Sequence, residues 1–347
     1  MNAAGAEADE DFEPPHPRAT TRLFGHAEAE RMLLDAYRGG RLPHGWLIGG
    51  PPGIGKATLA YRMARFVLAH PDPQLPAVQS APSLALPDDH PVARRVAAQA
   101  QGDLLVLERT IGETGKLRTR IAVDDVRRSV SFFGSTAGEG GWRIAIVDSV
   151  DELNPSSANA LLKVLEEPPA RALLLLVSHA PGRTLATIRS RCRLLTLRPL
   201  AAGDVARGAA AALGRDAYEP ALQEAAALAE GSIGRALTLI EGRALALRRR
   251  VVEVLGRLPK VDPRALHALG DALAGTEPLT LAIFLDTVNA WLSARLAQGP
   301  QDPARMARVA EAWDKVNRAA RDVDTYNLER KPLVFAVFGW LAEAARG

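Results

Sequence analysis

Five short apolar runs without polar alternation punctuate the first 200 residues of the chain, and helical patterns lie between most of them. Runs of this kind predict strands buried on both faces, as in a parallel sheet. The alternation of strand and helix in turn predicts a three-layer α/β domain over residues 21–199. The predicted strands are Trp46–Ile48, Leu104–Leu107, Ile144–Val147, Leu173–Val177 and Leu194–Leu197.

Beyond about Leu200 the strand signals stop and only helical patterns remain. We expect one helical domain of short helices over residues 200–245 and a second, with longer amphipathic helices, over residues 246–347. Prolines mark many of the expected boundaries. The predicted helices are Ala201–Leu213, Pro220–Ala229, Ser232–Leu245, Leu247–Leu258, Pro263–Ala274, Pro278–Ala297, Pro303–Val323 and Leu328–Ala344.

Two segments of the first 200 residues lack a clear periodic pattern. Residues 1–20 are acidic and contain three prolines, which predicts a disordered leader. The segment His70–Pro91 is rich in Pro, Ala, Asp and Ser, and we expect a loop or insertion there.

Composition narrows the class of protein further. The 347 residues carry 47% hydrophobic and 24% charged side chains, with a net charge of +3, which permits a partner that contacts DNA without requiring one. The single cysteine, Cys192, excludes an intramolecular disulfide and a multi-cysteine zinc site. With neither a signal peptide nor a run of 18 or more apolar residues, the sequence predicts a cytoplasmic protein without a membrane partner.

The first predicted strand runs into a glycine-rich segment and then an apolar-periodic helix, the context of a phosphate-binding loop. Glycines allow backbone N–H groups to converge on a phosphate, the helix amino end adds its dipole, and a lysine reaches the terminal phosphates. The candidate nucleotide-binding residues are Gly50, Gly53, Gly55, Lys56 and Thr58, together with Asp148 at the end of the third predicted strand.

Two positions argue against hydrolysis at this loop. The full pattern places a Ser or Thr directly after the lysine, where its hydroxyl binds Mg²⁺, but this chain has Ala57. Thr58 lies about 100° further around the helix. A hydrolysing AAA+ ATPase follows the strand-end Asp with a Glu that orients water, and here Ser149 follows Asp148. We therefore expect phosphate binding at most, without metal-assisted hydrolysis, and we predict no metal site.

Several motifs carry a resemblance to bacterial DNA polymerase III clamp-loader subunits, members of the AAA+ superfamily. The strongest is Asn159–Lys163 followed by Glu166–Pro169, and Thr187–Cys192 resembles that family's Ser-Arg-Cys motif. Phe24–His26 and Pro43–Gly45 also match. The resemblance covers about Leu23 to Leu200 with high specificity, and it implies that the two helical domains are a lid and a collar.

Within this family the chain is more similar to a non-hydrolysing subunit than to the gamma/tau motor. Besides Ala57 and Ser149, it has Gly234 where the ATPase subunits place their sensor-2 arginine. The resemblance implies gamma/tau and delta subunits, the sliding clamp and primed DNA as partners. Many relatives carry a four-cysteine zinc module where this chain has the cysteine-free segment His70–Val106, so we expect no zinc. Residual binding of ATP or ADP stays open.

The resemblance also implies that Arg191 acts as an arginine finger on ATP bound to a neighbouring subunit. A guanidinium suits this role because it is permanently charged and grips phosphate oxygens bidentately. The alternative is a surface or salt-bridged arginine. The resemblance further places Ser178 at the sensor-1 position. We expect Cys192 to be a packing residue, and His44 to be structural.

Two other functions remain in competition with the non-hydrolysing clamp-loader subunit. One is an active AAA+ ATPase with an unusual loop, which would turn over Mg-ATP by itself. The other is a P-loop kinase for a small molecule, which would need an acceptor pocket and lid arginines. The long helical carboxy-terminal region favours assembly over the kinase.

Overall fold

The computed structural model describes residues 16–110, 118, 120–134, 141–241, 244–274, 278–297, 303–326 and 328–346. The chain separates into two compact units, Met1–Leu237 and Thr238–Gly347. Each unit has a hydrophobic core of its own.

The first unit is built on a parallel five-stranded sheet with the strand order β2-β3-β4-β1-β5. Each of the five predicted apolar runs forms one strand, so the predicted parallel sheet is confirmed. Parallel pairing requires a crossover between strands, and here the crossovers place helices on both faces. The strands are β1 Gly45–Gly49, β2 Leu104–Glu108, β3 Arg143–Asp148, β4 Ala172–Ser178 and β5 Arg193–Thr196.

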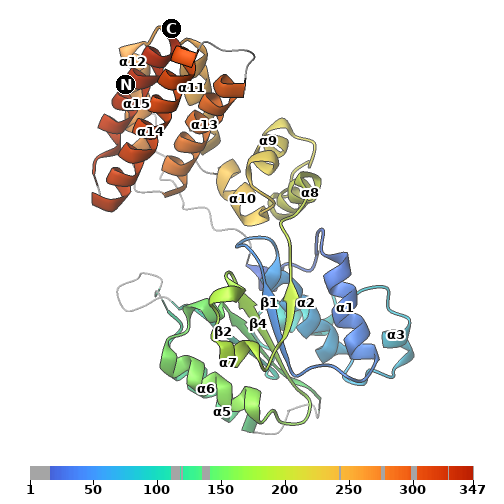
Figure 1. The fold of residues 1–347 in the computed structure, drawn as a ribbon. Coiled ribbons are helices and arrows are strands. Elements are labelled where there is room, and N and C mark those ends of the chain that lie inside the picture. Colours follow the sequence, from blue (N-terminus) through green and yellow to red (C-terminus); the bar gives the residue numbers. More distant parts are fainter. Residues whose placement is uncertain are drawn as a thin grey trace, which may run out of the picture. The chain divides into compact units, whose positions relative to one another are not determined.

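Helices cover both faces of this sheet, as Figure 1 shows. Along β3, Ile144 and Ile146 enter one core, which α1, α2 and α4 complete. Ala145 and Val147 enter the core on the opposite face, with α5, α6 and α7. This alternation follows from the two-residue period of a strand and gives the predicted three layers. The helices are α1 Ala27–Arg38, α2 Lys56–Ala69, α4 Pro91–Ala97, α5 Val123–Gly134, α6 Pro155–Glu166 and α7 Ala186–Arg189.

The segment His70–Pro91, predicted as a loop, contains the short helix α3 Pro76–Gln79 and the first residue of α4. Val78 and Leu84 are fully buried in the core beneath it. A single helical turn is marginal by itself, so these apolar anchors and contacts to α1 hold it. The Glu30 carboxylate accepts a hydrogen bond from the Leu84 N–H at 3.0 Å, and the Arg38 Nε donates to the Val78 carbonyl at 2.8 Å.

The structure describes residues 16–20, which precede the predicted domain start at residue 21. Pro17–Ala19 form a short 3-10 helix. His16 Nε2 lies 3.0 Å from Glu108 Oε2 at the end of β2, and the Arg65 Nη1 donates to the Thr20 carbonyl at 2.8 Å. The prediction of disorder is therefore wrong for residues 16–20, because these contacts come from distant parts of the chain. The first 15 residues of the predicted leader lie outside the described residues.

Three helices follow the sheet: α8 Ala202–Leu213, α9 Pro220–Leu228 and α10 Ile233–Glu241. They correspond to the predicted short helices, although α10 ends four residues before the predicted Leu245. The first unit ends at Leu237, within α10. The Leu200 N–H donates to the Gly231 carbonyl at 3.0 Å, and the Gly234 N–H donates to the Gly53 carbonyl at 3.1 Å. These contacts join the predicted lid helices to the sheet-bearing unit.

The second unit is helical in its described residues, as predicted. Its apolar core includes Phe284 and Phe338, both fully buried. The structure describes no helix that is both long enough and apolar enough to cross a membrane. The helices are α11 Ala244–Gly256, α12 Pro263–Leu273, α13 Pro278–Ala297, α14 Pro303–Tyr326 and α15 Arg330–Ala345.

Candidate functional site

The phosphate-binding loop joins the end of β1 to the start of α2, as the sequence predicted. Gly50, Gly53 and Gly55 have φ angles of 149°, 72° and 100°, a region that L side chains rarely adopt. At Gly50 a side chain would also meet the Leu197 carbonyl oxygen, only 2.5 Å from its Cβ. The loop therefore needs glycine at these positions, and α2 begins directly after it with Lys56.

Lys56 is buried, with 3% of its surface exposed, and its ammonium donates to the Pro51 carbonyl of its own loop at 2.5 Å. Burial lowers the pKa of Lys56 from 10.5 to about 8, while Asp148 and Asp151 act in the opposite direction. The ammonium is thus held among oxygen atoms at the amino end of α2. A bound phosphate would compete with the Pro51 carbonyl for this charge.

The carbonyls of the loop are also held from outside it. His26, which is buried, places its Nε2 2.7 Å from the Ile54 carbonyl oxygen. Burial lowers the pKa of His26, and because the carbonyl can only accept, the neutral ring donates through Nε2. The Gly234 N–H donates to the Gly53 carbonyl. Sequence reasoning noted His26 only as part of a motif and missed its contact with the loop.

A cavity of about 580 Å³ opens beside this loop, within the usual size range of small-molecule sites. The loop and the start of α2, including Thr58, line it together with Asp148. Apolar residues of the N-terminal segment, α8 and α10 also line it: Leu23, Phe24, Gly208, Ala212, Ile233 and Leu237. A phosphate cradle next to an apolar wall fits a nucleotide.

The residues around the cavity do not fit metal-assisted hydrolysis. Ala57 lines the cavity and offers no oxygen. Burial raises the pKa of Asp148, against the opposing effect of Lys56. Ser149 is 1% exposed, and its hydroxyl has no hydrogen-bond partner among the described residues.

Two acidic residues that follow Ser149 in the chain are held by neighbouring groups. The Asp151 carboxylate accepts hydrogen bonds from the Ser178 hydroxyl at 2.9 Å and from the His179 N–H. Glu152 forms an ion pair with Arg109, whose Nε lies 2.9 Å from the carboxylate. Ser178, at the predicted sensor-1 position, is fully buried. Asp151 therefore fastens the turn after β3 to the end of β4, and Glu152 fastens the same turn to the residue after β2.

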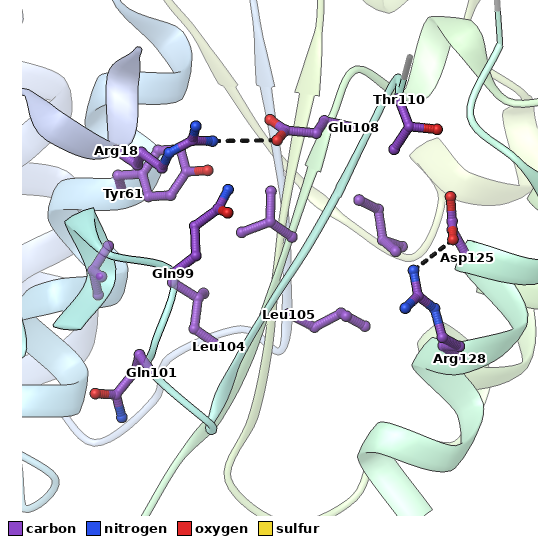
Figure 2. A pocket seen from close by; sticks show the side chains of 13 residues that line it. Arg18, Tyr61, Gln99, Gln101, Leu104, Leu105, Glu108, Thr110, Asp125 and Arg128 are labelled. Atoms are coloured by element: carbon purple, nitrogen blue, oxygen red, sulfur yellow. Dashed lines mark hydrogen bonds and ion pairs between the residues drawn. The ribbon is translucent and has the colours of Figure 1, made fainter. Parts of the chain in front are cut away.

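A second cavity, of about 370 Å³, surrounds the outer edge of β2 (Figure 2). Figure 2 shows Arg18 and Tyr61 on one side of the strand and Arg128 on the other. Glu108 lies at the carboxyl end of β2. His16 and Arg18 lower the pKa of the Glu108 carboxyl through hydrogen bonds and their charges. The charged groups here tie the N-terminal segment to the sheet edge.

Arg191 lies at the opposite end of the sheet from the phosphate-binding loop. It precedes β5, where Arg193 pairs with Trp46, whereas the loop follows Gly49 at the other end of β1. At about 3.3 Å per strand residue, six residues separate the two positions by roughly 20 Å. Arg191 is accordingly absent from the residues that line the larger cavity.

The neighbours of Arg191 behave as the sequence predicted. Cys192 packs against the core on the α5–α6 face of the sheet, and burial raises the pKa of its thiol to about 12. Its sulfur lies 3.1 Å from where a side chain on Gly45 would begin. His44 has a structural contact, with Nε2 3.1 Å from the Leu165 carbonyl oxygen.

Comparisons with known proteins agree with this arrangement. Residues 25–201 match the family described as DNA polymerase III, delta subunit. The DNA polymerase III subunit delta' of Pseudomonas aeruginosa is 38% identical over 164 residues, which cover 47% of this chain and 46% of that protein. The Escherichia coli subunit delta' is 32% identical over 219 residues, which cover 60% of this chain and 58% of that protein.

The chain thus spans about half the length of these relatives. Among solved structures, a DNA polymerase III gamma subunit-related protein from Thermotoga maritima is similar, with 16% identity and a TM-score of 0.39, over 90% of this chain and 100% of that one. The family match extends from the motif at Gly25 through the loop, the sheet and Arg191 to the start of the helices. The chain therefore belongs to the family described as DNA polymerase III, delta subunit, and two delta' subunits are among its relatives.

Proposed function

We propose that this chain is a delta-prime subunit of a DNA polymerase III clamp loader and that it does not hydrolyse ATP itself. The observation that carries the proposal is a phosphate-binding loop that keeps its glycines and Lys56 while the groups for hydrolysis are missing around it. We expect its partners to be gamma/tau and delta subunits, the sliding clamp and primed DNA. We expect the protein to act in the cytoplasm.

Three missing groups support the absence of hydrolysis. Ala57 cannot supply the hydroxyl ligand of Mg²⁺, and the buried hydroxyl of Ser149 stands where a water-orienting glutamate would be. Losing such a base alone lowers a rate by about 10²–10⁴. Gly234 packs directly on Gly53, and a Cβ on Gly234 would begin only 3.2 Å from the Gly53 Cα. A side chain at this position would require the neighbouring loop to shift by a few tenths of an ångström.

Nucleotide binding without hydrolysis fits what remains. The loop and Lys56 would hold the phosphates, and the apolar wall of α8 and α10 would face the base. We expect no zinc requirement. The segment that stands where relatives carry a zinc module is anchored in the core by the buried side chains of Val78 and Leu84.

Arg191 is the residue through which the subunit would contribute to catalysis, as an arginine finger. Its position, roughly 20 Å from its own loop, is too far for contact with a nucleotide held there, and this supports a role on the nucleotide of a neighbouring subunit. An arginine finger stabilises the charge that develops on the transferred phosphoryl group and contributes about 10³–10⁵ in rate in other NTPases.

The test is a clamp loader reconstituted from gamma/tau, delta and this chain, with clamp loading and ATP turnover as readouts. We expect loading to require this chain, and the Arg191→Ala variant to slow turnover by at least tenfold. Loading that proceeds equally well without the chain would contradict the proposal. The isolated chain should not turn over Mg-ATP. Robust turnover that disappears in Lys56→Ala would instead establish the competing function, an active ATPase.

A further inference from the structure

The guanidinium of Arg191 is held in one orientation by three neighbours. Its Nη2 forms an ion pair with Glu166 Oε1 at 2.9 Å. Its Nη1 donates to the Thr187 carbonyl at 3.0 Å and to the Ser190 hydroxyl at 3.2 Å. Thr187 and Ser190 lie next to Arg191 in the chain, whereas Glu166 comes from α6. Glu166 is therefore the contact that the tertiary structure adds.

The backbone that carries Glu166 is firmly placed. Glu166 is the last residue of α6, and the preceding Leu165 is 1% exposed. His44 contacts the Leu165 carbonyl, and the Glu167 N–H donates to the Lys163 carbonyl at 3.2 Å. A side chain on such a rigid element can fix a partner more accurately than one on a loop.

The backbone of Arg191 is equally well placed. Its N–H donates to the carbonyl of Ile188, which is buried, at 3.1 Å. The adjacent Cys192 is packed against Gly45. With both backbones fixed, the ion pair sets the direction of the side chain that joins them.

The held guanidinium still has donors to offer. An arginine has five N–H groups, and the contacts among the described residues occupy three of them. The Arg191 side chain is 35% exposed and the Glu166 side chain 49%. Two N–H groups therefore remain for phosphate oxygens of a neighbouring molecule.

We propose that Glu166 is a positioning residue for Arg191, which it holds ready to meet the nucleotide of the neighbouring subunit. This inference rests on the role proposed for Arg191. A long side chain loses much rotamer freedom when it is fixed, and Glu166 removes part of that cost before the subunits meet. An ion pair at this exposure corresponds to about a two- to fivefold effect.

The experiment measures ATP turnover of the reconstituted clamp loader with variants of this subunit. Glu166→Ala should lower kcat about two- to fivefold and leave the KM for ATP unchanged, because Arg191 acts on the transition state. Glu166→Gln keeps an oxygen acceptor and should restore part of the loss. Glu167→Ala is the matched control: it removes the adjacent exposed carboxylate, which does not contact Arg191, and should behave as the unmodified subunit.

The double variant Glu166→Ala/Arg191→Ala decides whether Glu166 acts through Arg191. We expect it to match Arg191→Ala alone, since Glu166 has nothing left to position. Additive losses, or turnover in Glu166→Ala equal to or faster than normal, would overturn the positioning role while Arg191 keeps its own. A silent Arg191→Ala would show that the proposed function of Arg191 has failed. Gel filtration of each loader verifies that every variant is incorporated.

Discussion

Replacing Lys56 by methionine tests whether the phosphate-binding loop keeps its lysine at a cost in stability. Burial lowers the pKa of Lys56 from 10.5 to about 8 in the folded protein. The unfolded chain therefore binds this proton more tightly than the folded one does. By linkage, the stability of the unmodified protein should rise as the pH increases from about 8 to 10.5.

The size of the effect follows from the pKa. One pKa unit corresponds to about 1.36 kcal/mol, so lowering the pKa from 10.5 to about 8 makes the charged form about 3 kcal/mol less favourable. Methionine keeps the apolar stem and loses the hydrogen bond to the exposed Pro51, worth about 1 kcal/mol. We expect Lys56→Met to be about 2 kcal/mol more stable than the unmodified protein at pH 7, and about equal to it at pH 10.

The assay is equilibrium urea unfolding of the full chain at pH 7 and pH 10, followed by circular dichroism. Lys163→Met, which removes an exposed lysine in the same unit, is the control and should show no such change between the two pH values. A Lys56→Met protein that is no more stable at pH 7, or whose advantage does not shrink at pH 10, would refute the reasoning. The outcome matters for function. If replacing Lys56 makes the protein more stable, then Lys56 does not serve stability, and binding of phosphate is the role that remains for it.

Three further predictions concern single positions and are measured as changes in the free energy of unfolding by urea. Gly53→Ala should cost about 1–3 kcal/mol, because the φ of Gly53 is +72° and the new Cβ would begin 2.3 Å from the Ser232 hydroxyl. Gly40→Ala is the control. Gly40 has a φ of +65° and open space around it, so this substitution measures the backbone contribution alone and should cost less. Leu84→Ala should cost about 2–5 kcal/mol because this leucine is fully buried, and a negligible cost would contradict the anchoring of the segment around it. Asn154→Ala removes the side-chain cap of α6 and should cost about 1 kcal/mol, whereas Asn154→Asp, which keeps an acceptor, should retain most of the stability.

The candidate site divides into parts that local sequence indicated and parts that it could not. Gly50 to Lys56 were predicted because the phosphate-binding pattern is local to one strand, one loop and one helix. The contact of His26 with the Ile54 carbonyl joins residues 28 positions apart, and no local pattern encodes it. The ion pair of Arg191 with Glu166 was equally invisible, since Glu166 ends α6 and Arg191 follows α7, so that only the packing of these elements brings the two residues together.

The sequence by itself determined the architecture. Apolar runs such as Ile144–Val147 give strands because burying both faces leaves no room for polar alternation, and the proline and periodicity signals give the helices. Only the tertiary structure decided that residues 16–20 are ordered and that the segment after His70 holds a short helix. In both cases the stabilising partners, Glu108 for the first and Glu30 for the second, are far away in the chain.

The tertiary structure also decided which end of the sheet each functional group occupies. The strands β1 and β5 are neighbours and run parallel. The phosphate-binding loop follows β1 and therefore lies at the carboxyl ends of the strands, whereas Arg191 precedes β5 and therefore lies at the amino ends. The residue types came from the sequence, but the roughly 20 Å between them came from the pairing of β1 with β5. That separation is the physical reason why Arg191 does not contact a nucleotide held by its own loop, and the proposed role for Arg191 on a neighbouring subunit starts from it.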